Sequence, residues 1–249
     1  MTKKKYIDFG YKDIPEADKE QKVGEIFTKV APKYDLMNDA MSFGMHRLWK
    51  RYFIKIANVQ SGDDICDLAS GSADIALLMA HKVVDGSITI SDINAEMLQV
   101  GYDKMLDNGH AGKVKKVLAN AEKLPFEDDS FDLVTMSFGL RNVTDKKLAL
   151  REMLRIVRPG GKVLIMEFSE PKASSIKSLY DKFSFNIIPR LGGYIANDYD
   201  SYKYLVESIR RHPTQEKLKE WFYEVGFDSC KVYNIHTGVV AIHEGIKVQ

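Results

Sequence analysis

The sequence predicts a doubly wound α/β fold with a mostly parallel, seven-stranded sheet. From about residue 62 onwards, short apolar segments typical of strands alternate with amphipathic segments typical of helices. Such alternation is typical of a parallel sheet that carries helices on both faces. One of these segments, KVLIMEF, is apolar enough for a strand that is buried on both faces. The last part of the chain has the pattern of a closing β-hairpin, which completes the seven strands.

The first sixty residues precede this alternation. Residues 1–20 are polar and include three consecutive lysines, Lys3–Lys5, so we expect a flexible polar arm. An apolar spacing of i, i+3, i+4 and i+7 then predicts a helix with one buried face, formed by Val23, Ile26, Phe27 and Val30. Pro32 ends this helix. We expect residues 21–249 to form a single domain, in which residues 21–61 are an N-terminal helical lid.

Five strand segments follow. In order they are DDICDLA, SITISD, KVKKVLA, FDLVTMS and KVLIMEF. Helices are expected after the first two strands, over residues 75–84 and 95–106. A third helix, over residues 145–157, precedes the fifth strand and ends before Pro159-Gly160-Gly161.

The regular alternation is interrupted late in the chain. Residues 172–210 contain many aromatic residues, and we interpret them as an insertion. In the first of two interpretations, this insertion is a helical cap that buries its rings. Beyond it, Thr214 is expected to cap a helix that ends at Gly226. Residues 229–236 and 239–243 are expected to form the closing hairpin.

Composition excludes several classes of protein. The 249 residues include 36 Lys and Arg against 35 Asp and Glu, and a net charge of +1 argues against a nucleic-acid binder. Two cysteines, Cys66 and Cys230, exclude a disulfide scaffold and fit a reducing cytoplasm. No apolar run approaches the roughly 20 residues that span a bilayer, and no apolar stretch follows the basic start as in a secretory signal. We therefore expect a soluble intracellular domain.

Two further classes of site lack support. No group of His, Cys and Asp residues has the spacing of metal ligands. The G-x-S-x-G motif of α/β-hydrolases is also missing. The sequence therefore supports neither a metalloenzyme nor a hydrolase.

The turn after the first strand predicts a ligand site. Ligands of doubly wound sheets bind beyond the carboxyl ends of the strands. This turn, from Asp67 to Asp74, consists mostly of small residues, and Gly71 can adopt a positive φ without steric cost. The second strand ends at Asp92, where an acidic residue typically binds ribose hydroxyls. These features predict a cofactor that contains a nucleoside.

Charge favours one such cofactor. The turn lacks the G-x-G-x-x-G motif of dinucleotide sites, and Asp67 and Asp74 flank it. Two carboxylates would repel a diphosphate, whereas they would attract the ammonium and sulfonium groups of S-adenosylmethionine. In an alternative interpretation, Asp74 only caps the helix that follows.

Other polar residues follow the remaining strands. Asn120 comes after the third strand, where its amide could bind the edge of an adenine. Ser137 lies where the fourth strand ends, although a serine there is most often only a turn former. Arg141 and Asn142 lie in the loop after this strand.

Several of these motifs resemble those of class I S-adenosylmethionine-dependent methyltransferases, which have a Rossmann-like fold. They are the D-x-x-x-G turn, the acid at a strand end, the A-N-A-E-x-L-P-F turn and the R-P-G-G before the fifth strand. Three longer segments resemble the ubiquinone/menaquinone-biosynthesis C-methyltransferases: VAPKYDLMNDAMSFGMHRLWKR, SFGLRNVTDK and NDYDSYKYLVESIRRHP. The resemblance extends from about Lys22 to Gly245.

The resemblance implies a function and a set of cofactor-binding residues. The implied reaction is methylation of a ring carbon on a polyprenylated quinol, either a benzoquinol (2-polyprenyl-6-methoxy-1,4-benzoquinol), a naphthoquinol (demethylmenaquinol) or both. The implied cofactor is S-adenosylmethionine. Its binding residues would be Asp67, Gly71, Ser72, Asp92, Asn120, Ala121 and Ser137.

The turn departs from the usual family sequence. Related proteins read D-L-A-G-G-T-G-D, whereas this chain has Ser70, Ser72 and Ala73 in place of a Gly, a Thr and a Gly. The hydroxyl of Ser72 preserves a hydrogen-bonding group. Any positive φ at Ser70 or Ala73 would cost about 1 kcal/mol or more because both residues have a Cβ.

Methylation of a quinol carbon suggests which residues act in catalysis. The carbon becomes more nucleophilic when a ring hydroxyl ionises, so a base or a cation is expected near the phenolate. We expect Arg141, beside Asn142, to stabilise the phenolate and to orient a water molecule. In the alternative interpretation, Arg141 forms a structural ion pair with an acid such as Asp145. His46 is another candidate base, because the unperturbed pKa of histidine suits that role. The segment HRLWKR is also typical of an ordinary basic helix face, and this is the interpretation that we favour.

The resemblance also bears on partners and location. A polyprenyl chain needs an apolar trough, which is the second interpretation of residues 172–210. Lys3–Lys5 and Lys50-Arg51 could contact anionic lipid at the inner membrane surface, or they could be only solvated. No nucleic-acid partner is expected, and a homodimer or a complex of quinone-biosynthesis enzymes is left open. Two other functions are also open: a methyltransferase for another apolar small molecule, and a cofactor-binding regulatory protein without turnover.

Overall fold

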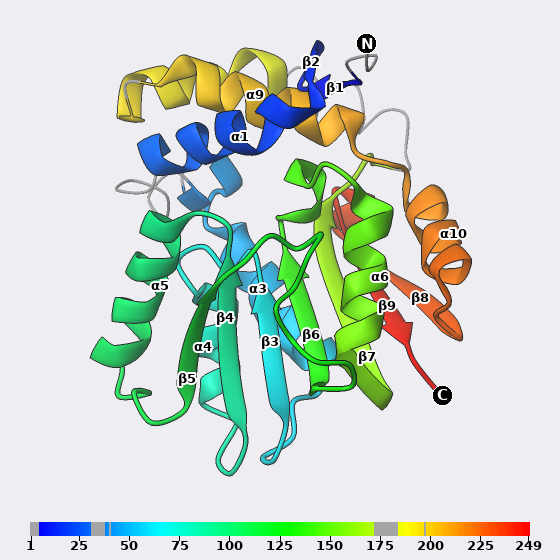
Figure 1. Ribbon diagram of the computed structural model, residues 1–249. Coiled ribbons are helices and arrows are strands. Elements are labelled where there is room, and N and C mark those ends of the chain that lie inside the picture. Colours follow the sequence, from blue (N-terminus) through cyan, green and yellow to red (C-terminus); the bar gives the residue numbers. More distant parts are fainter. Residues whose placement is uncertain (1–4, 31–37, 40, 172–183, 197) are drawn as a thin grey trace.

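The computed structural model describes residues 5–30, 38, 39, 41–171, 184–196 and 198–249. A seven-stranded sheet with the order β5-β4-β3-β6-β7-β9-β8 forms its centre (Figure 1). Its strands are β3 (Asp64–Leu68), β4 (Ser87–Asp92), β5 (Val114–Leu118), β6 (Phe131–Ser137), β7 (Val157–Phe168), β8 (Ser229–Ile235) and β9 (Val240–Ile246). The first five of these pair in parallel, and β9 is antiparallel to both β7 and β8. The predicted fold class is confirmed.

Strand β7 shows why the fifth apolar segment is a central strand. Val163 and Ile165 pack into the core on one face, while Leu164 and Met166 pack into the core on the other. The strand begins at Val157, earlier than the sequence predicts, and its pairing with β6 is irregular where Pro159-Gly160-Gly161 interrupts the ladder. These residues therefore produce a bulge within the strand rather than a loop before it.

Helices cover both faces of the sheet, as predicted. On one face lie α3 (Met45–Ala57), α4 (Asp74–Ala80) and α5 (Ala95–Asp107), and on the other lie α6 (Lys146–Ile156) and α10 (Gln215–Val225). Polar side chains begin three of these helices, because Asn94, Asp145 and Thr214 each accept a hydrogen bond from a first-turn amide. Gly226 ends α10 with a φ of 117°, so both predicted ends of that helix are confirmed.

The polar arm predicted over residues 1–20 is wrong for the part that the structure describes. Tyr6–Phe9 (β1) and Lys12–Pro15 (β2) form an antiparallel hairpin, and α1 (Glu16–Val30) begins directly after it. The hairpin is held by α9 (Tyr199–Arg211): the ring of Phe9 stacks on Tyr204 at 4.4 Å. These partners lie almost 200 residues away, so local composition could not reveal them. Lys3 and Lys4 lie outside the described residues.

The two helices of the predicted lid over residues 21–61 lie in different layers of the structure. Helix α1 lies beside α9 above the edge where the parallel strands end (Figure 1). Val30 of α1 packs in one cluster with Tyr202 and Val206 of α9. In contrast, α3 belongs to the layer of helices on the sheet, because Trp49 and Phe53 pack into the main core. Much of the segment around Tyr34 lies outside the described residues.

The aromatic insertion of residues 172–210 is helical where it is described. It contains α8 (Ile188–Leu191), the π-helical turn Gly192–Ala196 and α9. Tyr202 and Tyr204 are buried, whereas Tyr194 is 90% exposed. The insertion therefore caps the sheet edge with some of its rings and leaves others at the surface. Tyr180 and Phe183 lie outside the described residues.

The described residues contain neither a membrane-spanning helix nor a cluster of metal ligands. No helix among them combines the length and the apolar character that crossing a membrane requires. Among the same residues, no group of three or more His, Cys, Asp or Glu side chains could hold a metal ion.

Candidate functional site

Two adjoining pockets lie at the carboxyl ends of the parallel strands. They share Gly71, Ser137 and Asn142, so they are continuous with each other. Every residue that the sequence predicts for the site lines one or both of them. The first pocket is lined by Asp67, Gly71, Ser72, Ser137, Arg141 and Asn142, and the second by Gly71, Asp92, Asn120, Ala121, Ser137 and Asn142. The strand order reverses between β3 and β6, at the position where ligands of doubly wound sheets bind.

Asp67 presents an unpaired carboxylate oxygen at the end of β3. Its Oδ1 accepts a hydrogen bond from Thr135 Oγ1 at 2.6 Å, whereas its Oδ2 is buried and has no partner among the described residues. Burial raises the pKa of Asp67 to about 7. A buried, unsatisfied oxygen of this kind is costly unless a donor reaches it. A cation or an N–H donor in the pocket would therefore bind here.

The turn after β3 is strained at two alanines. Gly71 has a φ of 53°, which glycine adopts at no steric cost, but Ala69 has a φ of 49° and Ala73 a φ of 58°. The strain that the sequence predicts for a positive φ therefore falls on Ala73, whereas Ser70 keeps a negative φ. The hydroxyl of Ser70 is buried without a partner among the described residues. This turn thus contributes a second polar atom that a ligand could satisfy.

Asp92 joins the first two strand ends. Its Oδ2 accepts a hydrogen bond from Gly71 N and its Oδ1 accepts one from Asn94 N, both at 2.9 Å. Each carboxylate oxygen can accept a second hydrogen bond, so Asp92 could still bind two ribose hydroxyls. Burial raises the pKa of Asp92.

Asn120 lines the second pocket but is engaged by α1. Its Nδ2 donates to Glu20 Oε2 at 3.0 Å, and its Oδ1 accepts from Glu122 N at 2.9 Å. Its predicted contact with an adenine edge stays a prediction, and it would compete with Glu20. The sequence could not indicate this contact, because the two side chains are 100 residues apart.

Asp74 is not an uncompensated charge beside the turn. Lys50 Nζ and Lys104 Nζ each donate to one of its carboxylate oxygens. Burial by itself would raise the pKa of Asp74, but the two lysines outweigh burial and hold this pKa below its usual range. The interpretation of two repelling carboxylates around the turn is therefore wrong for Asp74. The alternative that Asp74 caps α4 is also wrong, since Ala73 occupies the cap position.

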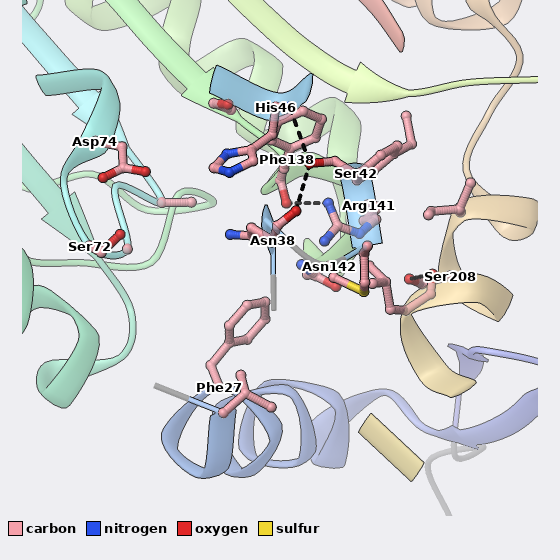
Figure 2. Close-up of a pocket in the computed structure, with 18 of the residues that line it drawn as sticks. Phe27, Asn38, Ser42, His46, Ser72, Asp74, Phe138, Arg141, Asn142 and Ser208 are labelled. Carbon is pink, nitrogen blue, oxygen red and sulfur yellow. Dashed lines mark hydrogen bonds between the residues drawn. The ribbon is translucent and has the colours of Figure 1, made fainter. Parts of the chain in front are cut away.

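The opposite wall of the first pocket carries the residues predicted to act in catalysis. Figure 2 shows Arg141 and Asn142 on one side of the pocket, with Ser72 and Asp74 on the other. Ser137 lies between the two pockets, and its buried hydroxyl has no partner among the described residues. The site therefore has a β3 side and a β6 side with a cavity between them.

Arg141 lies in the single 3-10 turn that follows β6, Leu140–Asn142, and forms a buried ion pair. Its Nη1 donates to both carboxylate oxygens of Glu167 at 3.2 Å and also to the main-chain oxygen of Phe138. The ion-pair partner that the sequence suggests, Asp145, is wrong: its side chain accepts from Leu148 N and begins α6. Arg141 nevertheless lines the first pocket, so the ion pair does not remove it from the site.

Sequence reasoning missed two residues that contact Arg141 and Asn142 of this wall. Glu167 is 2% exposed at the end of β7, and its only sequence signal is a single acid in the apolar segment KVLIMEF. Tyr204 of α9 donates its hydroxyl to Asn142 Oδ1 at 3.1 Å, and burial raises the pKa of this tyrosine. Tyr204 links the insertion to the loop after β6, a contact that no local pattern predicts.

His46 faces the pocket rather than solvent. It is 6% exposed, its Nε2 lies 2.8 Å from Asp39 Oδ1, and Lys50 one turn later is also buried. The favoured interpretation of HRLWKR as an ordinary basic helix face is therefore wrong for these two side chains. The exposed face of α3 consists instead of Arg47, Leu48, Arg51, Tyr52 and Lys55.

Comparison with known proteins shows close relatives of the whole chain. The model of the ubiE/COQ5 methyltransferase family matches residues 16–247. The chain is 51% identical over 240 residues to a ubiquinone/menaquinone biosynthesis C-methyltransferase, UbiE, of Pseudomonas paraeruginosa. This match covers 96% of this chain and 94% of the relative. The protein of the same name from Pseudomonas aeruginosa is 50% identical with the same coverage.

Solved structures with a similar fold are more distant in sequence. A SAM-dependent methyltransferase from Aquifex aeolicus superimposes with a TM-score of 0.58 at 13% identity, covering 79% of this chain and 88% of that one. The [4+2]-cyclase SpnF superimposes with a TM-score of 0.62 at 16% identity, covering 92% and 96%. Since one of these proteins is a methyltransferase and the other a cyclase, this likeness establishes the fold and not the reaction.

Proposed function

The chain belongs to the ubiE/COQ5 methyltransferase family, and we propose that it transfers a methyl group from S-adenosylmethionine to a ring carbon of a polyprenylated quinol. The observation that carries the proposal is the pair of joined pockets. One contains Asp92 and Asn120 at the ends of β4 and β5, and the other extends from Asp67 at the end of β3 to Arg141 between mostly apolar walls. Two reactants can therefore lie end to end in one cavity.

The polar residues at the carboxyl ends of the strands fit S-adenosylmethionine. The unpaired Oδ2 of Asp67 can accept a hydrogen bond from the ammonium of the methionine part, and Asp92 can accept from the ribose hydroxyls. The buried hydroxyls of Ser70 and Ser137 offer two further unsatisfied polar atoms. Ala121, in the wall of the second pocket, lies where an adenine would pack. When bound, this cofactor supplies an electrophilic methyl group.

Helix packing against the turn gives a first test of the cofactor site. A Cβ at Gly101 of α5 would lie 2.5 Å from Gly71 O, whereas a Cβ at Gly112, in the turn before β5, would meet nothing within 4 Å. We expect Gly101→Ala to displace the turn, to destabilise the protein by about 1–3 kcal/mol and to weaken S-adenosylmethionine binding at least tenfold. Gly112→Ala is the matched control, because Gly112 lines neither pocket, and it should leave both unchanged or raise stability by up to about 1 kcal/mol. Calorimetric titration and thermal unfolding measure the two effects, and equal cofactor affinity in both variants would contradict this assignment of the turn.

The walls of the first pocket fit an apolar acceptor. They are mostly apolar or aromatic side chains from α1, α3, β6, β7 and the insertion: Phe27, Val30, Trp49, Phe138, Phe168, Ile188, Tyr202, Leu205 and Ile209. Such a lining can bury a prenyl chain through the hydrophobic effect and keep water from the reacting carbon. Helix α9 both caps the sheet edge and lines the first pocket. The two interpretations of the insertion, as a cap and as a trough for the prenyl chain, are therefore compatible.

Arg141 and Asn142 are the polar groups beside this apolar lining. The guanidinium of Arg141 stays protonated and can stabilise the phenolate of the ionised quinol. Ionisation directs electron density to the ring carbon. With the cofactor bound, this carbon would take the methyl group as the bond from sulfur to methyl breaks, and the ring carbon would then lose its proton to water. Asn142, held by Tyr204, can orient the quinol hydroxyl or that water.

The function is tested by product analysis under anaerobic conditions. The purified protein is incubated with S-adenosylmethionine and with one short-prenyl quinol, either the benzoquinol or the naphthoquinol lacking the methyl group. We expect a mass increase of one CH2 unit on at least one quinol, because the methyl group replaces a ring hydrogen, and the ring accepted identifies the substrate. Tight cofactor binding without product from either quinol would instead favour a regulatory protein or a different apolar acceptor.

A prenylated substrate resides in a membrane, and we propose that the protein reaches it by peripheral contact with the anionic inner membrane surface. The exposed face of α3 combines Arg51 and Lys55 with Leu48 and Tyr52, and its opposite face lines the first pocket. Lys50, which the sequence suggests for lipid contact, faces the pocket and is replaced in this role by Lys55. Basic residues near such a surface contribute about 1 kcal/mol each.

Flotation with phosphatidylglycerol vesicles tests this contact. The double variant Arg51→Glu and Lys55→Glu should lower the bound fraction at least tenfold relative to the unchanged protein. A control with the same change of charge at the two sheet edges, Lys115→Glu and Lys231→Glu, should bind as well as the unchanged protein. Equal loss in both variants would mean that net charge, and not this face of α3, determines binding.

A further inference from the structure

The buried carboxylate of Glu167 faces Arg141 from outside the pockets. Glu167 lines neither pocket and is 2% exposed. Its Oε1 accepts from Arg141 N at 3.1 Å and from Arg141 Nη1 at 3.2 Å. Its Oε2 accepts from Arg141 Nη1 at 3.2 Å and from Phe168 N at 3.0 Å. One carboxylate therefore holds both the main chain and the side chain of Arg141.

The geometry of this pair leaves part of the guanidinium for another partner. Both oxygens of Glu167 bind the same nitrogen, Nη1, which also donates to Phe138 O. The pair is thus not the parallel two-nitrogen fork that fully occupies an Arg side chain. Arg141 Nε is buried and has no partner among the described residues. Because Glu167 holds Nη1, it also sets the direction in which the rest of the guanidinium points.

From these contacts we propose that Glu167 is a positioning residue for methyl transfer: it aims the guanidinium of Arg141 at the phenolate of the quinol and balances its charge. The inference rests on the function proposed above and goes beyond it by assigning a role to a residue that does not touch either reactant. Arg141 in turn lies between Phe138 and Asn142 on the pocket wall (Figure 2). Loss of the carboxylate would leave Nη1 held only by the main-chain oxygen of Phe138, so the guanidinium would be less firmly oriented.

The negative charge of Glu167 has a second, independent effect, which is on the ionisation of the quinol. A buried negative charge behind Arg141 lowers the net positive charge that a phenolate meets, because electrostatic interactions are strong in a poorly solvated site. Removing that charge should make ionisation of the bound quinol easier, even while the guanidinium becomes poorly aligned. Ionisation of the quinol should therefore become easier while methyl transfer becomes slower, a combination that a purely structural role would not produce.

Other titratable groups face the same site and define what must be measured. From the elements packed around Arg141 and the pocket these are Tyr204, Lys146, His212, His46, Lys50 and Asp67. Burial, with Lys19 nearby, lowers the pKa of Lys146 to about 8, and burial raises that of Asp67 to about 7. A rate profile alone would mix the titrations of Lys146 and Asp67 with that of the quinol. Absorbance of the bound phenolate reports the quinol directly.

The experiment compares Glu167→Gln and Glu167→Asp with the unchanged protein. Glu244→Gln is the matched control, because Glu244 is also a largely buried glutamate on the adjacent strand β9 but binds Tyr233 and lines neither pocket. The apparent pKa of a short-prenyl quinol is titrated anaerobically by phenolate absorbance, with S-adenosylhomocysteine bound so that no turnover occurs. The kcat and KM values and the midpoint of thermal unfolding are measured alongside.

We expect Glu167→Gln to lower kcat at least a hundredfold, to change cofactor affinity less than twofold and to lower the pKa of the bound quinol by half a unit or more. Glu167→Asp keeps the charge but moves it, so kcat should fall while this pKa stays within 0.3 of the unchanged protein. The control, Glu244→Gln, should leave kcat and the pKa of the bound quinol unchanged. Folded Glu167→Gln protein with unchanged kcat and unchanged quinol pKa would overturn the inference. If the unchanged protein methylates no quinol, the proposed function fails instead.

Discussion

Replacing Arg141 by Ala is expected to lower kcat by at least a hundredfold while S-adenosylmethionine affinity changes less than threefold. The guanidinium is the cation on the β6 side of the first pocket, where the quinol is proposed to bind. Removal of one preorganised group that stabilises developing negative charge typically costs about 10²–10³ in kcat. The cofactor residues Asp67 and Asp92 lie at the ends of other strands, so their contacts should persist. Steady-state kinetics with a prenylated quinol and calorimetric titration of the cofactor measure the two effects.

The change also removes one partner of a buried ion pair, which by itself costs about 3–5 kcal/mol. Arg141→Lys keeps the charge while losing the planar guanidinium, and it should fold and show an intermediate loss of kcat. Arg158→Ala is the matched control: Arg158 is also paired with two acids, Asp64 and Asp132, but at the opposite end of the strands. It should keep kcat within about threefold. Full turnover in folded Arg141→Ala protein would falsify the role of the guanidinium.

Asp67 should make cofactor binding strongly dependent on pH. Burial raises its pKa to about 7 in the protein without ligand, whereas the ammonium of the cofactor binds the ionised form. Each pH unit below 7 should therefore lower S-adenosylmethionine affinity up to about tenfold, with a plateau above about pH 8. Asp67→Asn should lower affinity at least a hundredfold at pH 8 and remove most of the pH dependence. Calorimetric titration between pH 5.5 and 8.5 measures both.

The same pKa predicts the sign of a stability effect without ligand. Because the folded-state pKa of Asp67 lies above the unfolded value of about 3.9, the folded state binds more protons between about pH 4 and pH 7. The free energy of unfolding should thus fall as pH rises through that window. Asp67→Asn, which cannot ionise, should be more stable than the unchanged protein at pH 8 and similar at pH 4. Greater stability of the unchanged protein at pH 8 would contradict a buried, unpaired carboxylate.

Predictions from local patterns succeeded where the physics is local. Thr214 and Gly226 end α10 as expected, because a cap depends on the residues next to it. The small residues of the turn and Asp92 were brought together, since carboxyl ends of parallel strands meet at one edge of a sheet. Strain at Ala73 was likewise predictable from the absence of glycine at that position.

Predictions about charge failed where partners are distant in the chain. Asp74 was expected to repel anions, but Lys50 and Lys104 neutralise it from two other helices. The aromatic residue Phe9 lies in a segment of polar composition and packs on Tyr204 of α9. Each of these pairings depends on which helices meet over the sheet, and composition within a short window carries no such information.

The sequence by itself determined the order of the sheet strands and their helices along the chain and the candidate site residues at the carboxyl ends of the parallel strands. The hydrophobic period of each segment specifies its secondary structure and its buried face, and these properties need only near neighbours. Only the tertiary structure decided the electrostatics of the site, including the pairing of Arg141 with Glu167 across 26 residues and the lone oxygen of Asp67. The physical reason is that charge and desolvation depend on distances through space, which the folded packing of remote segments alone establishes.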